Sequence, residues 1–323
     1  MEEEVVLVQD NIKLFSLNSN RPLAEKIAKH MDVKLSPATV KTFADGEIAL
    51  TVDESVRGCE VYIIQSISDP VNNSFMELMI MVDALRRASA KEVNVVIPYY
   101  GYARADRKTR AREPITAKLL ANFLQMVNVD RVLTLDLHAN QVQGFFNIPV
   151  DHLLAAPLLA HYFYEHDLLN DIVVVSPDHS SVSRARNFAE LIGAPIAIID
   201  NRKEIDQNSN QAIIGDVKNK NAIIIDDMID TANRVVCSAD VLKNAGVNKV
   251  YAAATHAVFS GNSIQKIDSS RINKVVITDS ILLSKDKLID KLAIVSVANL
   301  LSDAIIRIHN NLPVDELFNK NFK

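Results

Sequence analysis

Two adjacent carboxylates, Asp226 and Asp227, follow an apolar run that begins at Ala222 and is typical of a buried strand. Acids at the end of a strand suit the paired hydroxyl groups of a sugar, because carboxylate oxygens accept hydrogen bonds from hydroxyls. The residues beyond them, as far as Thr231, lead into a predicted helix whose first backbone N–H groups are free to bind a phosphate. These positions predict a sugar-phosphate site. The alternative is that the two acids cap a helix or point to solvent.

The residues after Thr231 and Ala232 depart from the usual chemistry of a phosphate loop. A backbone that approaches a phosphate closely usually contains glycine, which adopts conformations that other residues avoid. This chain has Asn233 and Arg234 instead. We therefore expect the phosphate end of the site to be altered.

The densest cluster of positive charge lies at 98–118, between a predicted strand and a predicted helix. Loops at the carboxyl ends of strands bind ligands in open α/β sheets, and guanidinium groups suit the oxygens of a polyphosphate. The segment therefore predicts a site for a nucleoside triphosphate; the alternative is a solvated, mobile basic loop. Its cations are Arg104, Arg107, Lys108, Arg110 and Arg112.

Acids and imidazoles follow two further predicted strands. His138 follows Asp136 just beyond one strand, and Asp178 and His179 follow another that ends at Ser176. A carboxylate and a neutral imidazole from neighbouring loops could share a partly hydrated Mg²⁺, although Mg²⁺ usually favours oxygen ligands. For His138 the alternative is a buried histidine that forms a hydrogen bond at the end of a strand.

The segment KTFADGEIALTV, 41–52, contains the turn residues Asp45 and Gly46 between β-like residues and predicts a hairpin. In this turn Phe43 could stack on a base, and Asp45 and Glu47 could accept hydrogen bonds from an amino group. Taken alone, the segment favours an ordinary hairpin.

The composition is that of an ordinary globular protein. A chain of 323 residues favours two domains, and 48% hydrophobic residues allow a large core. The net charge of −5 argues against nucleic acid or anionic membranes as partners. The start MEEEVV does not resemble a secretory signal, and no apolar run reaches the roughly 18 residues of a membrane span. We therefore expect a cytoplasmic protein.

Glycines and cysteines exclude several other classes of site. The eight glycines are not spaced as in the motifs G-x-G-x-x-G and G-x-x-x-x-G-K-[ST]. Their spacing argues against dinucleotide oxidoreductases and P-loop kinases. Cys59 and Cys237 are too few for a disulfide framework or a cysteine metal site. We expect both to be core thiols.

Short β-rich runs alternate with longer segments of helical periodicity. Many of the runs are continuously apolar, as expected for strands of a parallel sheet that is covered on both faces. The pattern therefore predicts an α/β fold. The predicted strands are 12–17, 61–66, 93–98, 131–137, 171–176, 195–200, 221–227, 249–256 and 274–280. The predicted helices are 19–31, 72–90, 114–127, 181–193 and 231–246.

Several long motifs occur in order along the chain, among them FADGE, QSISDPVN, REPITAKLLAN, DLHANQVQGFFNIPVDHL, VVSPD and DDMIDTA. With these motifs the chain resembles the ribose-phosphate pyrophosphokinase family, class I type. Members of this family make phosphoribosyl diphosphate from ribose 5-phosphate and ATP. The resemblance extends from about Lys13 to His309.

The resemblance implies two phosphoribosyltransferase-like domains with mostly parallel sheets flanked by helices. The N-terminal domain, 1–150, would carry the ATP side and be completed by a C-terminal helix at 297–311. The C-terminal domain, 151–296, would carry the ribose 5-phosphate side. The resemblance also implies Mg²⁺ as cofactor, ATP as co-substrate, and a homo-oligomer, commonly a hexamer, in which ATP lies near a subunit boundary.

Site residues can be carried over position by position from the same resemblance. His138 and Asp178 would serve the Mg²⁺ site. The residues that would hold adenine from a neighbouring subunit are Phe43, Asp45 and Glu47, and those that would contact ATP are Arg104 and Asp106. The residues that would bind ribose 5-phosphate are Asp226, Asp227, Asp230, Thr231, Ala232, Asn233 and Arg234.

Three loops on the substrate side differ from the family pattern. The phosphate loop T-A-G-T of the family has Asn233 and Arg234 at its last two positions. The catalytic loop, which normally opens with Lys and has Arg two positions later, has Asn201 and Lys203. Loss of a well-placed cation that neutralises the moving pyrophosphoryl group can slow a reaction on the order of 10³-fold. Two serines replace the Gly-Gly pair after Asp178, and Ala105 replaces a usual Gln in the ATP loop.

These departures leave hypotheses of different classes open. In the first, the protein is a pyrophosphokinase, with Arg202, Lys203 or Arg234 supplying the missing cations. In the second, it is a catalytically impaired paralogue that binds nucleotide and serves as a structural or regulatory subunit, with its own copies or with an active relative. A third hypothesis, a transferase that consumes phosphoribosyl diphosphate, leaves the basic loop at 98–118 unexplained.

Overall fold

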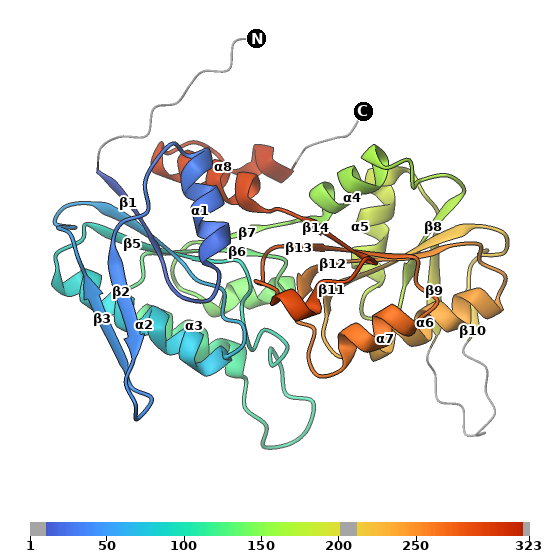
Figure 1. Ribbon diagram of the computed structural model, residues 1–323, viewed down its shortest axis with the longest axis horizontal. Helices are drawn as coiled ribbons and strands as arrows, with labels where there is room; N and C mark the ends of the chain where they lie inside the picture. The colour runs from blue at the N-terminus through green and yellow to red at the C-terminus, as the bar shows by residue number, and fades with distance from the viewer. Residues whose placement is uncertain (1–10, 201–211, 319–323) are drawn as a thin grey trace, which may run out of the picture. The chain divides into compact units, whose positions relative to one another are not determined.

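The computed structural model describes residues 11–200 and 212–318 (Figure 1). Asn201, Arg202 and Lys203, the cation positions of the expected catalytic loop, lie outside these ranges. The chain forms two compact units. The first contains the residues up to Leu154, Ser280–Leu282 and the segment from Ser296, and the second contains Ala155–Asp279 and Leu283–Val295.

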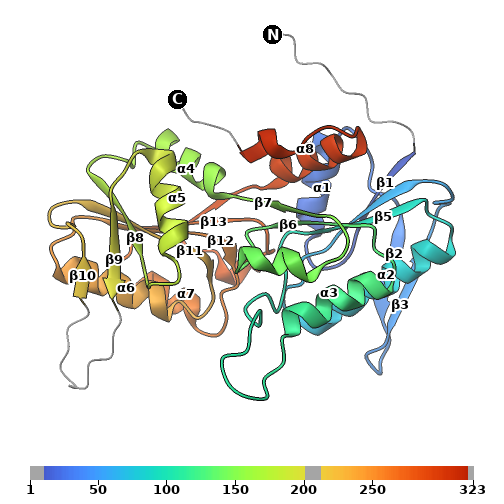
Figure 2. The same cartoon turned by 180° about the vertical axis from the view of Figure 1, so that it is seen from behind.

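A five-stranded parallel sheet forms the centre of the first unit. Two helices, α2 and α3, cover one face, and α1 and α8 cover the other (Figures 1 and 2). In spatial order the strands are β1 (Ile12–Ser16), β4 (Glu60–Ile64), β5 (Glu92–Ile97), β6 (Arg131–Leu135) and β7 (Val150–Leu153). The helices are α1 (Arg21–His30), α2 (Val71–Arg87), α3 (Thr116–Met126) and α8 (Ala298–His309), with 3₁₀ turns η1 (Asn140–Phe145) and η3 (Asp315–Phe318).

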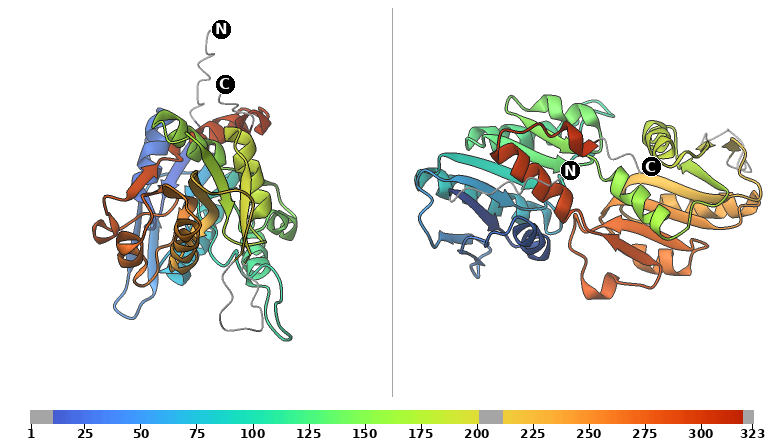
Figure 3. Two further views of the ribbon diagram at one scale, coloured as in Figure 1. Left: turned by 90° about the vertical axis from the view of Figure 1, so that its right-hand side faces the viewer. Right: turned by 90° about the horizontal axis from the view of Figure 1, so that it is seen from above.

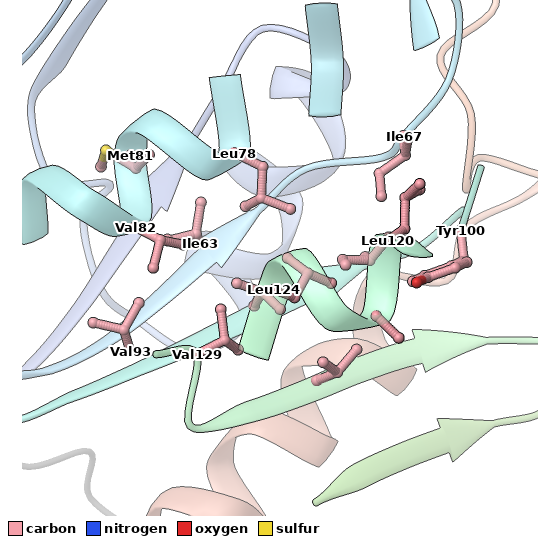
Figure 4. Packing of buried hydrophobic residues seen from close by; sticks show 14 of the residues in the cluster. Ile63, Ile67, Leu78, Met81, Val82, Val93, Tyr100, Leu120, Leu124 and Val129 are labelled. Atoms are coloured by element: carbon pink, nitrogen blue, oxygen red, sulfur yellow. The ribbon is translucent and has the colours of Figure 1, made fainter. Parts of the chain in front are cut away.

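The apolar residues that recur at helical spacing in the sequence form part of the core of this unit. Leu78, Met81, Val82 and Leu85 of α2 recur at intervals of three and four residues, so they share one face of the helix. That face is buried against the sheet together with residues of α3 such as Leu124 (Figure 4). Burial of this apolar surface holds both helices on the sheet and so positions the loops that follow its strands.

The C-terminal helix α8 packs in the first unit although it follows the whole second sheet in sequence. Its His309 Nδ1 lies 2.8 Å from Glu60 Oε2 of β4, and Tyr62 donates to the other oxygen of Glu60 at 2.5 Å. Asp303 of α8 pairs with His30 of α1 at 3.1 Å. Because Glu60, Tyr62 and His309 are buried, these bonds satisfy groups that water does not reach.

The predicted hairpin is present, formed by β2 (Ala38–Thr42) and β3 (Ile48–Val52), which pair antiparallel. Gly46 has φ of 94°, a conformation that favours glycine. In the turn, the N–H of Phe43 donates to the carbonyl of Glu47 at 2.7 Å, and the N–H of Glu47 donates to the Asp45 side chain at 3.1 Å. The turn residues therefore project together from the unit.

A seven-stranded sheet forms the second unit and is parallel except for β10. Two helices, α4 and α5, cover one face, and α6 and α7 cover the other (Figures 1 and 3). In spatial order the strands are β10 (Ala212–Ile214), β9 (Ile196–Asp200), β8 (Ile172–Ser176), β11 (Asn221–Ile229), β12 (Val250–Ala257), β13 (Lys274–Thr278) and β14 (Leu292–Val295). The helices are α4 (Ala156–Glu165), α5 (Val182–Ile192), α6 (Asn233–Asn244) and α7 (Ser263–Ser269), with the 3₁₀ turn η2 (Lys285–Lys287).

The predicted α/β fold with mostly parallel sheets flanked by helices is confirmed, and each predicted strand and helix is present. Two expectations were wrong. The strand β11 does not stop at Asp227 but continues to Ile229, because it keeps its pairing with β12. Cys237 is exposed on α6 rather than buried. None of the helices in 11–200 and 212–318 combines the length and the hydrophobicity that crossing a bilayer requires.

Gly101, at the start of the basic loop, is predicted to be intolerant of a side chain. A Cβ at this position would lie 2.4 Å from the carbonyl oxygen of Ile67 and 2.7 Å from its Cγ2. Because a backbone carbonyl cannot move aside as a flexible side chain does, Gly101→Ala should lower the free energy of unfolding by about 1–3 kcal/mol. Urea denaturation would measure this change.

The matched control is Gly144→Ala, since a Cβ at Gly144 would meet no atom within 4 Å. We expect this variant to unfold within about 0.5 kcal/mol of the unmodified protein. Equal stability of the two alanine variants would contradict the close contact at Ile67.

Candidate functional site

The carboxylates of the second unit lie where its strand order changes direction. The chain passes from β8 to β9 on one side and from β11 to β12 on the other, so the neighbouring strands β8 and β11 form a topological switch point. Ligands of open α/β sheets bind at the carboxyl ends of such strands. The pairing of β8 with β11 ends at Val175 and Ile224, so the rest of β11 lies beside the loop that follows β8.

Asp178 lies in that loop and is held by its own neighbours. Its Oδ1 accepts hydrogen bonds from the Ser180 hydroxyl at 2.7 Å and from the Ser181 N–H at 2.9 Å. Its Oδ2 pairs with Arg234 at 3.0 Å. Burial raises the pKa of Asp178, but the Ser180 hydrogen bond and the Arg234 charge outweigh burial, and the pKa is lowered below its ordinary value.

Asp226 and Asp227 lie near the end of β11 and differ in their surroundings. Asp226 accepts from the Ser181 hydroxyl at 3.2 Å and pairs with Arg234 at 3.1 Å. Asp227 is only 2% exposed, and its Oδ1 lies 3.3 Å from Arg184. Burial and the neighbouring charge of Asp227 raise the pKa of Asp226 to about 7, against the opposing charges of Arg234 and Arg184.

Ser181 connects the two strands through both of its polar groups. It is the N-terminal cap residue of α5, yet its hydroxyl does not bond to the backbone of the helix. Instead the hydroxyl donates to Asp226 while the N–H donates to Asp178. Ser181 therefore fixes the two carboxylates relative to each other.

Asp178, Asp226 and Asp227 are here called the carboxylate cluster, and two of them share one guanidinium group. The guanidinium Nη1 of Arg234 lies within 3.1 Å of oxygens from both Asp178 and Asp226, so this arrangement of oxygens already accommodates a positive charge. Carboxylate oxygens are also the ligands that Mg²⁺ prefers. Within the described residues, no group of three or more His, Cys, Asp or Glu side chains is placed to hold a metal ion, so a Mg²⁺ here would rest on one or two carboxylates, with water or substrate oxygens as its other ligands.

The predicted phosphate loop adjoins the cluster on the carboxyl side of β11. Its residues Asp230, Thr231 and Ala232 lead directly into α6, whose first residues are Asn233 and Arg234. Ala232 has φ of 62°, in the left-handed region that residues other than glycine rarely adopt. The loop is thus sharply turned at the position where the predicted phosphate would bind.

Lys266 is a neighbour of this loop that the sequence analysis missed. It comes from α7, and its Nζ lies 2.8 Å from Asn233 Oδ1 and 3.5 Å from the carbonyl oxygen of Thr231. Arg184, on α5, was missed as a partner of Asp226 and Asp227. Arg184 lies six residues after Asp178, but Lys266 is more than thirty residues from the loop, and no sequence signal indicates its place.

The residues predicted to bind adenine lie together in the β2–β3 turn of the first unit. Phe43 is 58% exposed, which is unusual for a large aromatic side chain, and Asp45 and Glu47 are also exposed. The hydrogen bonds of the turn place these three side chains within one tight loop. They form an exposed group rather than a pocket of their own.

The basic loop follows β5 and ends at α3. Arg104 is exposed and Asp106 is half-buried. The loop is partly ordered by Glu113, whose carboxylate accepts from the N–H groups of Thr109 and Arg110, both at 2.9 Å. The hydrogen bonds from Thr109 and Arg110 hold the pKa of Glu113 below its ordinary value, so the carboxylate stays ionised among the arginines.

His138 follows β6 in the first unit and is half-buried. The preceding residue, Leu137, donates its N–H to His152 Nε2 at 2.8 Å. His152 lies on β7, and the sequence analysis did not identify it as a site residue. It anchors the loop that carries His138. His138 belongs to the first unit and Asp178 to the second, and their shared metal site stays a prediction.

The raised pKa of Asp226 predicts a pH-dependent stability. Between its ordinary value of 3.8 and about 7, the folded protein keeps a proton that the unfolded chain has lost. The free energy of unfolding should therefore fall as the pH rises through this interval, by on the order of 1.4 kcal/mol for each pH unit. Chemical denaturation at pH 5 and pH 8 should show a smaller fall for Asp226→Asn.

Asp216→Asn is the control for this experiment. The pKa of Asp216 is lowered by its bond with Lys220, so it titrates below this interval. Its variant should lose as much stability between pH 5 and pH 8 as the unmodified protein. A fall of the same size in Asp226→Asn would contradict the raised pKa.

Comparisons with known proteins agree over nearly the whole chain. The family model for the N-terminal domain of ribose phosphate pyrophosphokinase matches residues 12–127, and that for the phosphoribosyl synthetase-associated domain matches residues 205–319. The chain is 58% identical over 309 residues to ribose-phosphate pyrophosphokinase 2 of Enterococcus faecalis, covering 95% of this chain and 96% of that protein. It is 54% identical over 312 residues to ribose-phosphate pyrophosphokinase 1 of Streptococcus pyogenes, covering 95% and 98%.

A solved structure extends this agreement to the fold. The crystal structure of phosphoribosylpyrophosphate synthetase from Mycobacterium smegmatis matches with a TM-score of 0.90 at 40% identity, covering 94% of this chain and 100% of that chain. The matched family models, the identity to curated relatives and this shared fold lead to one conclusion. The chain belongs to the ribose-phosphate pyrophosphokinase family.

Proposed function

We propose that the protein transfers the pyrophosphoryl group of Mg-ATP to the 1-hydroxyl of ribose 5-phosphate, giving 5-phosphoribosyl 1-diphosphate and AMP. The observation that carries this proposal is the carboxylate cluster at the β8–β11 switch point, directly beside a turned loop that leads into a helix. Such a site can hold hydroxyl groups at one end and a phosphate at the other. The family to which the chain belongs supports the same reaction.

In this proposal the two ends of the sugar bind to different groups. Asp226 and Asp227 accept hydrogen bonds from the ribose hydroxyls, while the backbone from Asp230 to Asn233 binds the 5-phosphate. Lys266 places a positive charge beside that loop. With both ends held, the 1-hydroxyl is restricted to a narrow range of directions, which lowers the entropic barrier to its attack on ATP.

For the metal and the nucleotide, the residues proposed are those carried over from the family resemblance. Asp178 and His138 would serve the Mg²⁺ ion, which neutralises phosphate charge when it is bound. Phe43 would stack on adenine, with Asp45 and Glu47 as acceptors, and Arg104 and Asp106 would contact the rest of ATP. Because the turn carrying Phe43 is exposed, we further propose that a second copy of the chain completes the nucleotide site in a homo-oligomer. A hexamer is the assembly that we propose.

A second candidate function is a nucleotide-binding subunit with little or no turnover. The contact of Arg234 with Asp178 and Asp226 favours it, because a guanidinium there competes with metal and sugar for the same oxygens. The Asn201 that replaces a family lysine favours it as well. Such a subunit would keep the fold and its assembly with its own copies or with an active relative, but not the transfer.

One assay separates the two candidates. Purified protein with Mg-ATP and ribose 5-phosphate should release AMP and phosphoribosyl diphosphate in equal amounts. Turnover at background level, together with measurable ATP binding, would select the subunit over the enzyme.

Restoring the family cations of the expected catalytic loop should show how strongly their replacement slows the transfer. The double substitution Asn201→Lys with Lys203→Arg restores the family residues, and we expect it to raise kcat by about 10- to 1000-fold, because cations aimed at the moving phosphoryl groups act in the transition state. The control is Asn299→Lys with Lys285→Arg, which makes the same chemical changes at exposed positions elsewhere. No gain, although ribose 5-phosphate binds, would reject the defect as the cause of slow turnover.

Lys266 should contribute to sugar-phosphate affinity. We expect Lys266→Ala to weaken ribose 5-phosphate binding by about tenfold, the equivalent of one charge-assisted contact, and to leave ATP affinity unchanged. Titration calorimetry would measure both ligands. Lys249→Ala is the control, because Lys249 is exposed just before β12, at the opposite edge of the sheet. An unchanged affinity for ribose 5-phosphate in Lys266→Ala would show that Lys266 does not belong to the phosphate site.

A further inference from the structure

Arg234 is the side chain of the phosphate loop that departs furthest from the family pattern, in which this position is a threonine. It is the second residue of α6, and its side chain points back toward β8 and β11 rather than along the helix surface. One nitrogen, Nη1, contacts Asp178 at 3.0 Å and Asp226 at 3.1 Å. The guanidinium therefore joins the loop after β8 to the end of β11.

The environment of Arg234 allows the guanidinium to leave this position. Its side chain is 52% exposed, whereas those of Asp178 and Asp226 are 23% and 14% exposed. An ion pair with one exposed partner contributes little net stability, because water competes for the guanidinium. The contact is thus strong enough to occupy the carboxylates of the free protein and weak enough to be exchanged for another anion.

We propose that Arg234 is a tethered cation that occupies the carboxylate cluster when the site is free and moves to the 5-phosphate when the sugar phosphate binds. This inference rests on the proposed function of the site. A phosphate offers the guanidinium more charge and a matching pair of oxygens, so the exchange is favourable. The phosphate loop begins in the residues directly before Arg234, so the new partner lies within reach of the same side chain.

The exchange couples two ligands that do not need to touch each other. When Arg234 leaves, the Oδ2 atoms of Asp178 and Asp226 lose this cation, while Arg184 still pairs with Asp226 and Asp227. A divalent cation then binds more tightly at Asp178. By thermodynamic linkage, a bound divalent cation raises the affinity for the sugar phosphate by the same factor.

Lys266 provides the contrast that makes the inference specific. Lys266 contacts neutral oxygens of Asn233 and Thr231, so it adds charge to the phosphate loop without occupying a carboxylate. Removal of Lys266 should weaken phosphate binding but leave the coupling intact. Removal of Arg234 should abolish the coupling.

The experiment measures metal affinity rather than turnover. Mn²⁺ serves as the divalent probe, and the loss of its free-ion electron paramagnetic resonance signal reports binding to the full-length protein. Titrations are made alone, with ribose 5-phosphate, with ribose and with inorganic phosphate. In the unmodified protein, ribose 5-phosphate should tighten Mn²⁺ binding by about 5- to 10-fold, in the usual range of coupling between sites, and ribose should not.

Arg234→Thr restores the family residue and should behave differently in two respects. Without sugar it should bind Mn²⁺ at least about fivefold more tightly than the unmodified protein, and ribose 5-phosphate should add at most about twofold. Arg234→Lys, which keeps a tethered charge, should retain part of the coupling. Asp178→Asn should remove the sugar-dependent metal binding, which would place that metal in the carboxylate cluster.

The outcomes separate the inference from the function on which it rests. If ribose 5-phosphate binds to the unmodified protein and to Arg234→Thr but tightens Mn²⁺ binding equally in both, the tethered-cation role is wrong and the proposed function stands. If neither protein binds ribose 5-phosphate in a direct titration, both the tethered-cation role and the proposed function are wrong. Circular dichroism and the thermal midpoint of each variant would show that it remains folded.

Discussion

The site depends on the reversal of strand order between β8 and β11. Because the two strands lead to helices on opposite faces of the sheet, the loops after them diverge and leave their carboxyl ends accessible. Asp178 leaves one strand there and Asp226 belongs to the other. The helix α5, which begins at that edge, contributes Ser181 and Arg184 to the same carboxylates. The chemistry of the second unit therefore follows from its topology.

The acids of this site differ in how their negative charge is compensated, and the compensating groups belong to the protein itself. Asp178 is held ionised by hydroxyl and guanidinium partners, whereas the adjacent acids Asp226 and Asp227 compete for two arginines in a buried place. Buried like charges are costly unless a cation or a proton compensates them. Arg234 supplies that compensation in the free protein. Arg234 thus sets the charge balance of the site in the free protein.

Much of the architecture could be predicted because it follows from the spacing of apolar residues along the sequence. Buried strands such as β8 are continuous apolar runs, and helices such as α2 repeat their apolar residues every three or four positions. The edge strands β7, β10 and β14 were missed, since each has at most four residues and little burial to mark it. The extension of β11 beyond Asp227 to Ile229 was missed for a different reason: its pairing with β12 overrides the local appearance of a strand end.

The sequence by itself determined which chemical groups are available: two acids after an apolar run, a predicted phosphate loop without glycine, a basic loop and a turn with an aromatic residue. These are properties of neighbouring residues, so order along the chain is enough to find them. Only the tertiary structure decided that Arg234 pairs with Asp178, that Ser181 bonds to Asp226 and that Lys266 reaches Asn233. Those contacts join residues more than thirty positions apart, and the packing of helices on the second sheet brings them together.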